Sequence, residues 1–175
     1  MKIVLISSSL SLYSHSRAML TRAENYFLTK GVETDLIDLR NIELEWCDGR
    51  PLENYNSSLQ DAFQRIQSAD GAVIASPVYC YSVSGVLKNF IDICHKAFAE
   101  KYFAVIIAGG GDYSFMVTEQ LKSILVLESR AFPLPRAVFA NEKQFKNHQL
   151  NDAGVEKRLQ QLADDLLRWI GESFK

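Results

Sequence analysis

Short runs of apolar residues alternate along the chain with longer segments in which apolar residues recur every three or four positions. The runs are rich in β-branched residues, and several are continuous, which is typical of strands buried on both faces of a parallel sheet. Pro77 is expected to end the third run and to keep Ser76 extended. Five runs are predicted to be strands: Lys2–Ser7, Val32–Leu39, Gly71–Tyr79, Tyr102–Ala108 and Arg136–Ala140.

The segments between these runs have the spacing of amphipathic helices. Gly31 stands where a helix needs a left-handed residue at its C-terminus. The polar stretch Asn41–Asn56 contains Gly49 and Pro51 and is predicted to be a long loop. Helices are predicted from Ser16 to Gly31, over Ser57–Ser68 and Val83–Phe98, around Leu121–Leu125, and over the stripe from Val155 to Ile170.

Strands that alternate with helices predict a parallel sheet covered by helices on both faces. Such sheets bind ligands beyond the carboxyl ends of their strands, at the point where the strand order reverses. The loops after the first, third and fourth strands are therefore the candidate binding segments.

Composition narrows the class of protein. A chain of 175 residues is predicted to form one domain, residues 1–175. The net charge of −2 provides no basic field for a nucleic-acid partner. No signal peptide or membrane span is expected, because no apolar run approaches the roughly 20 residues that a span needs. Cys47, Cys80 and Cys94 form no CxxC pair, which favours a cytoplasmic location.

The first candidate loop, Ser8–Ser16, is rich in serine and precedes a helix. Serine hydroxyls and the N–H groups of a helix N-terminus bind phosphate, so Ser9, Ser14 and Ser16 are candidate phosphate ligands. Ser14 or Ser16 could instead be only an N-cap, and Ser7 and Ser11 are interpreted as scaffold. The motifs GxxxxGK[ST] and GxGxxG are absent, which excludes a P-loop and argues against a dinucleotide fingerprint.

The second candidate loop, Ser76–Asn89, begins with a proline. Residues Pro77–Cys80 are predicted to form an apolar ledge whose N–H groups face the edge of a planar heteroaromatic ring. Tyr79 would supply an aromatic face, and Ser82 and Ser84 could cap the next helix. The alternative is that Pro77 only stops a strand and that Tyr79 is a surface aromatic. Cys80 has no histidine near it in the sequence, so a nucleophilic role is not favoured.

The third candidate loop, Ala108–Phe115, contains Gly109, Gly110 and Gly111. Three glycines permit close approach of a ligand to the backbone, although a tight turn would also use them. The three histidines form no metal-binding spacing, and no metal site is expected. His15 is a candidate polar neighbour of a bound phosphate.

These loops resemble those of the NAD(P)H-dependent FMN reductases, flavodoxin-like flavoproteins that include quinone and azo-dye reductases. The family's first loop has Gly-Ser, a serine five residues later and a polar residue two further on, which corresponds here to Ser8, Ser9, Ser14 and Ser16. Ser8 stands in place of the glycine. The family's second motif corresponds to Ser76, Pro77, Tyr79, Ser82, Gly85, Leu87, Lys88, Asn89 and Asp92.

The resemblance implies a flavodoxin-like α/β/α sandwich with a five-stranded parallel sheet in the order 2-1-3-4-5. It implies an enzyme that passes hydride from NAD(P)H through FMN to free flavin, a quinone or an azo compound, with no catalytic side chain, and that assembles as a homodimer or homotetramer. A flavodoxin-like electron carrier and a non-catalytic ligand-binding domain are the alternatives. The expected FMN-binding residues are Ser9, Ser14, Ser16, Pro77, Val78, Tyr79, Cys80, Ser82, Gly109, Gly110 and Gly111.

Overall fold

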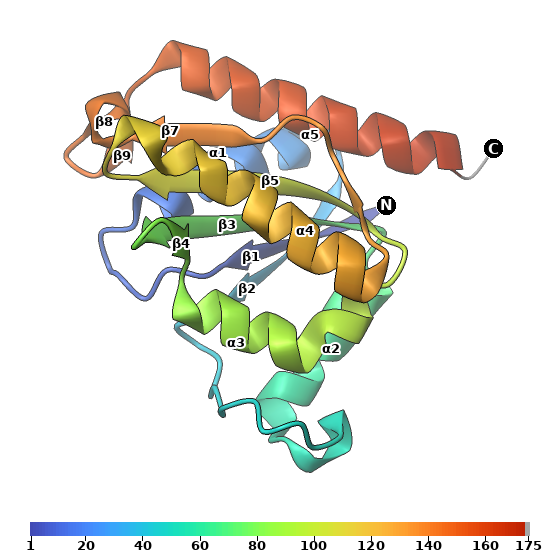
Figure 1. Ribbon diagram of the computed structural model, residues 1–175. Coiled ribbons are helices and arrows are strands. Elements are labelled where there is room, and N and C mark those ends of the chain that lie inside the picture. Colours follow the sequence, from blue (N-terminus) through green and yellow to red (C-terminus); the bar gives the residue numbers. More distant parts are fainter. Residues whose placement is uncertain (174–175) are drawn as a thin grey trace.

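The structure is a computed structural model that describes residues 1–173. Phe174 and Lys175, the end of the predicted domain, lie outside the described residues. The helices are α1 (His15–Thr29), α2 (Ser57–Ser68), α3 (Gly85–Cys94), α4 (Val117–Ser129) and α5 (Ala153–Ser173) (Figure 1). The strands of the main sheet are β1 (Lys2–Ser7), β2 (Glu33–Asp38), β3 (Gly71–Tyr79), β4 (Ser82–Val83), β5 (Tyr102–Gly109), β6 (Phe132–Pro133) and β7 (Val138–Asn141).

The central sheet has the predicted parallel order. Its strands run β2–β1–β3–β5, and β6 and β7 share the far edge of β5. The expected fifth strand, Arg136–Ala140, is observed as β7, which begins later, at Val138, and the separate strand β6 precedes it. Pro133 and Pro135 lie in or beside the gap, and proline cannot donate a ladder hydrogen bond.

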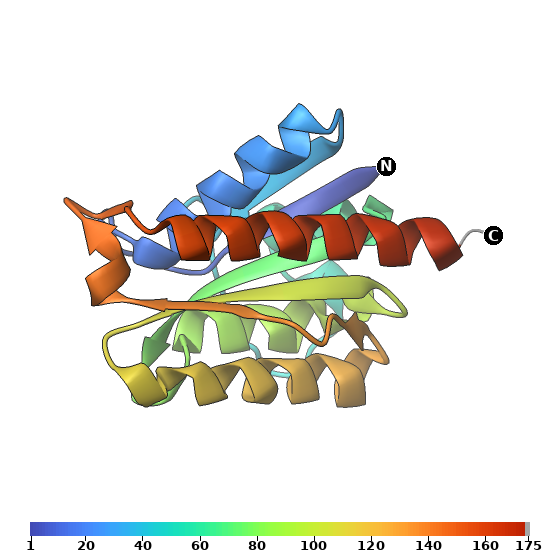
Figure 2. The same cartoon turned by 90° about the horizontal axis from the view of Figure 1, so that it is seen from above.

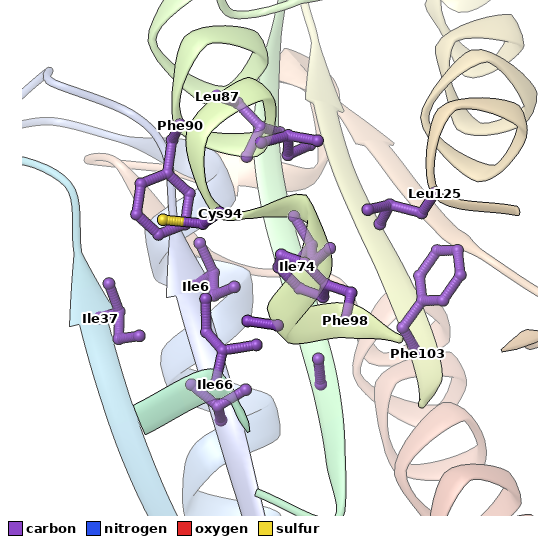
Figure 3. Close-up of a cluster of buried hydrophobic side chains, with 14 of the residues drawn as sticks. Ile6, Ile37, Ile66, Ile74, Leu87, Phe90, Cys94, Phe98, Phe103 and Leu125 are labelled. Atoms are coloured by element: carbon purple, nitrogen blue, oxygen red, sulfur yellow. The ribbon is translucent and has the colours of Figure 1, made fainter. Parts of the chain in front are cut away.

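Two hydrophobic cores lie on opposite faces of the sheet, and both depend on alternation along the strands. In β1, Ile3 and Leu5 belong to the core under α1 and α5, whereas Val4 and Ile6 belong to the core under α2, α3 and α4. Figure 2 shows the resulting three layers. In Figure 3 the aromatic rings of Phe90, Phe98 and Phe103 fill the second core between strands and helices. The predicted α/β/α sandwich is confirmed.

Capping residues set the ends of several helices. The side chains of Ser14, Asn56 and Ser84 accept hydrogen bonds from the backbone of α1, α2 and α3, respectively. Gly31, just after α1, has φ of 71°, as expected for a residue that ends a helix in the left-handed region.

The segment after β3 differs from the prediction. Pro77 does not end the strand, because β3 continues to Tyr79 and Pro77 pairs in register with Ala108. Ser82, a candidate helix cap, and Val83, the expected start of that helix, instead form β4, which is antiparallel to Val78 and Tyr79. The two-residue connection Cys80–Tyr81 has positive φ angles of 51° and 57°. A tight hairpin needs such angles and usually takes Asn-Gly, so the sequence carried no hairpin signal here.

A second small hairpin, β8 (Phe145–Lys146) with β9 (Gln149–Leu150), follows β7. It lies at the same end of the sheet as β4 and the loop after β1 (Figure 1). Its turn residues, Asn147 and His148, also have positive φ. Among the described residues no helix combines the length and apolar character needed to cross a bilayer.

Candidate functional site

The three loops predicted to bind a ligand meet at one cleft. It lies beyond the carboxyl ends of β1, β3 and β5, as the topology requires. Its volume is about 180 Å³, and it is open to solvent on one side. The lining residues are Ser9, Ser11, Tyr13, Ser14, His15, Ser16, Pro77, Val78, Tyr79, Ala108, Gly109, Gly110 and Glu142.

Serine hydroxyls of the first loop form one wall of the cleft. Ser9 Oγ accepts a hydrogen bond from Ser11 N at 3.3 Å, and Ser11 Oγ accepts one from Tyr13 N at 3.2 Å. A hydroxyl that accepts a backbone hydrogen bond keeps its own hydrogen for donation. Within residues 1–173, the hydroxyls of Ser9 and Ser11 donate to no other protein group. Both can therefore donate to a ligand.

The wall continues into the N-terminus of α1. Ser14 Oγ accepts a hydrogen bond from Arg17 N at 3.1 Å, which makes Ser14 the N-cap. The hydroxyls of Ser14 and Ser16 lie 3.0 Å apart and share one hydrogen bond, which leaves one hydrogen for another acceptor. Ser14 is thus the N-cap of α1 and also lines the cleft. We call Ser9, Ser11, Ser14 and Ser16 the serine cradle.

Ser8, which replaces the family's glycine, points away from the cleft. Its N–H and its hydroxyl both donate to Ala75 O in β3, at 3.0 and 3.1 Å. Ser84 Oγ lies 3.4 Å from both oxygens of Ser8. These hydrogen bonds tie the start of the loop to the sheet and to the N-terminus of α3, so the additional side chain braces the loop.

The second loop contributes Pro77, Val78 and Tyr79 to the cleft, and the Tyr79 side chain is more than half exposed. Cys80 and Ser82 are not among the lining residues. Cys80 lies in the β3–β4 turn, and Ser82 Oγ lies 3.0 Å from Gln120 Oε1 of α4. The expected ledge is therefore shorter than the sequence suggested.

The three glycines after β5 have different environments. A Cβ atom on Gly109 would lie 2.5 Å from the Cβ atom of Ser114, so this glycine is required by packing within the loop. A Cβ atom on Gly110 would meet nothing within 4 Å, and Gly110 lines the cleft. Gly111 also has open space around it but is not a lining residue.

The β8–β9 hairpin packs through aromatic contacts on Tyr13 and His15, which alternate in sequence with the serines of the cradle. The rings of His15 and Phe145 are stacked with centroids 4.0 Å apart, and those of Tyr13 and His148 lie 4.8 Å apart. The pKa of His15 is lowered by burial and by the neighbouring His148, against an opposing effect of Glu142. His15 therefore stays neutral to a lower pH than an ordinary histidine.

The described residues contain no group of three His, Cys, Asp or Glu side chains arranged to hold a metal ion. Cys94 is buried, and this burial raises the pKa of its thiol to about 12. Cys94 is consequently a packing residue, as its place on the apolar face of α3 indicates.

Five lining residues were not among the expected FMN-binding residues: Ser11, Tyr13, His15, Ala108 and Glu142, of which His15 was a candidate neighbour of the phosphate. The serine density of the loop was a usable signal for Ser11. Glu142 follows β7, almost 130 residues after the cradle, and only the tertiary fold brings it to the cleft.

Comparison with known proteins gives a consistent result. The model of the family described as NADPH-dependent FMN reductase matches residues 1–146. A relative named NAD(P)H-dependent FAD/FMN reductase, from Geobacillus thermodenitrificans, is 36% identical over 135 residues, which are 75% of this chain and 72% of the relative. The FMN-dependent NADPH-azoreductase of Staphylococcus aureus is 23% identical and covers 99% of this chain and 97% of its own.

Among solved structures, the flavoenzyme NAD(P)H:(acceptor) oxidoreductase FerB from Paracoccus denitrificans superposes with a TM-score of 0.82. It covers 98% of this chain and 97% of its own at 19% identity. At 19% identity this likeness shows a shared fold.

Proposed function

This chain belongs to the NADPH-dependent FMN reductase family, and from that premise we propose that the cleft is its FMN site. The chain is accordingly a flavin-dependent oxidoreductase that uses FMN and NAD(P)H. The proposal places the FMN phosphate in the serine cradle and the ring between Pro77–Tyr79 and Ala108–Gly110.

The serine cradle is the observation that carries this proposal. A flavin phosphate is a dianion, and the cradle offers hydroxyl donors at the positive end of the α1 dipole. Cationic side chains are absent from the lining, which suits recognition by hydrogen bonding rather than by ion pairing.

The opposite wall fits a planar ring. Pro77 and Val78 present apolar surface, and Gly110 lines the cleft without a side chain. FMN supplies the redox chemistry when bound, and the protein supplies binding and orientation. Backbone N–H groups in the two ring-side loops can stabilise negative charge at the ring edge.

The openness of the cleft supports transfer to a second small molecule. Its volume of about 180 Å³ is smaller than the roughly 300–1,000 Å³ of pockets that enclose a ligand of this size. Part of the ring would therefore remain accessible to a nicotinamide and then to an acceptor. We propose free flavin, a quinone or an azo compound as the acceptor. The names of two relatives, a flavin reductase and an azoreductase, support the first and the last of these.

The proposal extends to the organisation of the protein. We propose that residues 1–175 act as one FMN-binding domain in a homodimer or homotetramer, located in the cytoplasm. The single main sheet supports one domain. Apolar side chains exposed beside the cleft, such as Leu12 and Tyr13, support an assembly of subunits. The free thiols of Cys47, Cys80 and Cys94 support the cytoplasmic location.

Substitution of the cradle tests the phosphate assignment. The double variant Ser9→Ala/Ser14→Ala removes two hydrogen bonds to a charged group, so we expect FMN affinity to fall by about a hundredfold or more. Isothermal titration calorimetry on the flavin-free protein measures the dissociation constant directly. The same titration followed by anaerobic NADPH addition checks that flavin absorbance is lost in the wild-type protein.

Ser14 is also a helix cap, so a matched control is needed. Asn56→Ala removes the N-cap of α2, which does not line the cleft, and is expected to lower stability by about 1 kcal/mol without changing FMN affinity. If the double variant bound FMN as tightly as the wild type, the phosphate would have to lie elsewhere.

A further inference from the structure

A single carboxylate lines the cleft. Glu142 is the only acidic residue among the lining residues, which include no lysine or arginine. Its side chain is exposed, and within residues 1–173 its carboxylate accepts no hydrogen bond and forms no ion pair. A carboxylate is an unfavourable neighbour for a bound phosphate, because the two anions repel each other.

Hydrogen bonds of the backbone hold Glu142 at the cleft. It follows Asn141, the last residue of β7, which pairs in register with Gly109 of β5. Asn141 Oδ1 accepts a hydrogen bond from Lys143 N at 3.0 Å, and Gln144 Oε1 accepts one from Asn141 N at 2.8 Å. The turn that carries Glu142 is therefore fixed beside the glycine loop.

The nearest basic groups do not neutralise this carboxylate. Lys143, the next residue, directs its Nζ atom to Asp112 Oδ2 at 3.3 Å. Burial and His148 lower the pKa of His15, and Glu142 raises it by less, so that His15 is uncharged at neutral pH. Glu142 is thus a negative charge without a counter-ion within the part of the chain that the structure describes.

The cleft is small enough for this charge to act on a phosphate in the cradle. Its volume of about 180 Å³ corresponds to a sphere about 7 Å across, whereas salt at 0.1 M screens a charge only over roughly 10 Å. The effect of Glu142 on His15 supports this proximity, because His15 stands between Ser14 and Ser16 in the sequence. Glu142 and His15 also line a shallow cavity beside the β8–β9 hairpin.

We infer that Glu142 is a specificity-determining residue, whose carboxylate opposes the phosphate dianion in the serine cradle and so reduces the preference for FMN over a flavin without phosphate. The inference rests on the proposed FMN site. The hydroxyls of the cradle and the dipole of α1 attract the dianion, and Glu142 offsets part of this attraction.

The repulsion has a consequence for turnover. FMN is held less tightly than the cradle alone would hold it, and it dissociates faster, because changes within one binding site act mostly on the dissociation rate. Oxidised flavin can then replace reduced flavin between turnovers. This exchange suits the reduction of free flavin, one of the acceptors proposed above.

A carboxylate could instead accept hydrogen bonds from the ribityl hydroxyls, which FMN shares with riboflavin. Removal of such an acceptor would weaken the binding of both flavins. Removal of a repulsive charge strengthens the binding of FMN alone, since riboflavin carries no phosphate. The two roles therefore predict effects of opposite sign.

Titration calorimetry on the flavin-free protein with FMN and with riboflavin tests the inference. At about pH 7.5, where the phosphate is a dianion, Glu142→Gln is expected to bind FMN about tenfold more tightly than the wild type does and riboflavin within twofold. The gain for FMN should shrink to about twofold when the salt is raised from about 0.05 M to about 0.5 M. This salt dependence decides the question even if riboflavin binds too weakly to titrate.

Two variants are controls. Glu142→Asp keeps the charge and should bind FMN within about threefold of the wild type. Glu53→Gln removes an exposed carboxylate that does not line the cleft and should leave the affinity for both flavins unchanged.

Unchanged or weaker FMN binding by Glu142→Gln would overturn the inference, as would a gain that is equal for the two flavins or that persists at high salt. Each of these results leaves FMN bound to the wild type and the proposed function intact. Failure of both the wild type and Glu142→Gln to bind FMN would reject the proposed function itself.

Discussion

At the scale of single residues, the hydroxyls of the first loop divide into two groups. Ser9, Ser11, Ser14 and Ser16 face the cleft, whereas Ser8 turns back to Ala75 and to Ser84. Direction within the loop decides which group a serine belongs to, and a row of serines in a sequence carries no information about direction. This division leads to different expected effects of substitution.

Ser8→Gly restores the residue that is usual in the family. We expect it to lower the free energy of unfolding by about 1–2 kcal/mol, because a buried hydrogen bond is lost and glycine gains chain entropy in the unfolded state. Urea denaturation measures this loss, and FMN affinity is expected to stay within twofold. A variant of unchanged stability that had lost FMN binding would show that the Ser8 hydroxyl serves the ligand.

The three thiols should differ in reactivity. Cys47 and Cys80 are exposed, whereas the buried Cys94 has its pKa raised to about 12 and carries almost no thiolate at neutral pH. A thiol reagent at pH 7.5 is expected to label two cysteines in the native protein and the third only after unfolding. Rapid labelling of all three would contradict the packing assigned to α3. Cys80→Ser is expected to retain reductase activity.

At the scale of elements, the carboxyl end of β5 depends on two adjacent glycines with different roles. Gly109→Ala places a methyl group against Ser114 and Phe139, and we expect it to cost about 1–3 kcal/mol of stability through overpacking. The methyl group added by Gly110→Ala meets no protein atom, so the stability of this variant should be unchanged while its FMN affinity falls. Thermal unfolding and flavin titration of this pair separate the two effects; equal destabilisation of both variants would contradict the packing described.

The β8–β9 hairpin links stability to pH through His15. In the folded protein the pKa of His15 lies below its ordinary value of 6.5. At a pH between the pKa of the folded and that of the unfolded state, the unfolded chain therefore binds more protons than the folded protein. The free energy of unfolding of the flavin-free protein is therefore expected to decline as pH falls below about 6.5.

The His15→Gln variant should show a smaller decline between pH 7.5 and 5.5 in urea titrations. His95→Gln is the control for the loss of a histidine away from the cleft, since His95 lies on the opposite face of the sheet. An equal decline in the wild type and in His15→Gln would contradict the role given to His15.

The ends of an element were predicted correctly where the local sequence signal was strong. The helix Ser57–Ser68 was predicted with its observed ends, because its apolar stripe is regular, and the structure adds the N-cap Asn56. Both hairpins were missed, since their turns, Cys80–Tyr81 and Asn147–His148, lack the glycine that usually marks them. Their conformation is imposed by tertiary contacts, among them the contacts of His15 and Tyr13 with the second hairpin.

At the scale of the whole molecule, the surface of α3 and α4 bears on the proposed assembly. A cavity between these helices is lined in part by Ile91, Ile124 and Leu127, and the Leu127 side chain is 83% exposed. An apolar side chain this exposed is a common feature of an interface between subunits.

We expect light scattering after gel filtration to give the mass of a homodimer or homotetramer. Leu127→Lys should shift the protein toward the monomer, because burial of a charge opposes association. Leu28→Lys, on the exposed end of α1, is the control for added charge and should not change the mass. A monomeric wild type would contradict the proposed assembly.

The sequence by itself determined the architecture and the chemical class of the site. Strand runs and helical stripes are local patterns, and the ends of parallel strands meet wherever such a sheet forms. Only the tertiary structure decided which side chains share the cleft. It directed Ser8 away from the cleft and brought Glu142 to it across most of the chain. Side-chain direction and long-range proximity depend on packing, and packing is not a property of any short stretch of sequence.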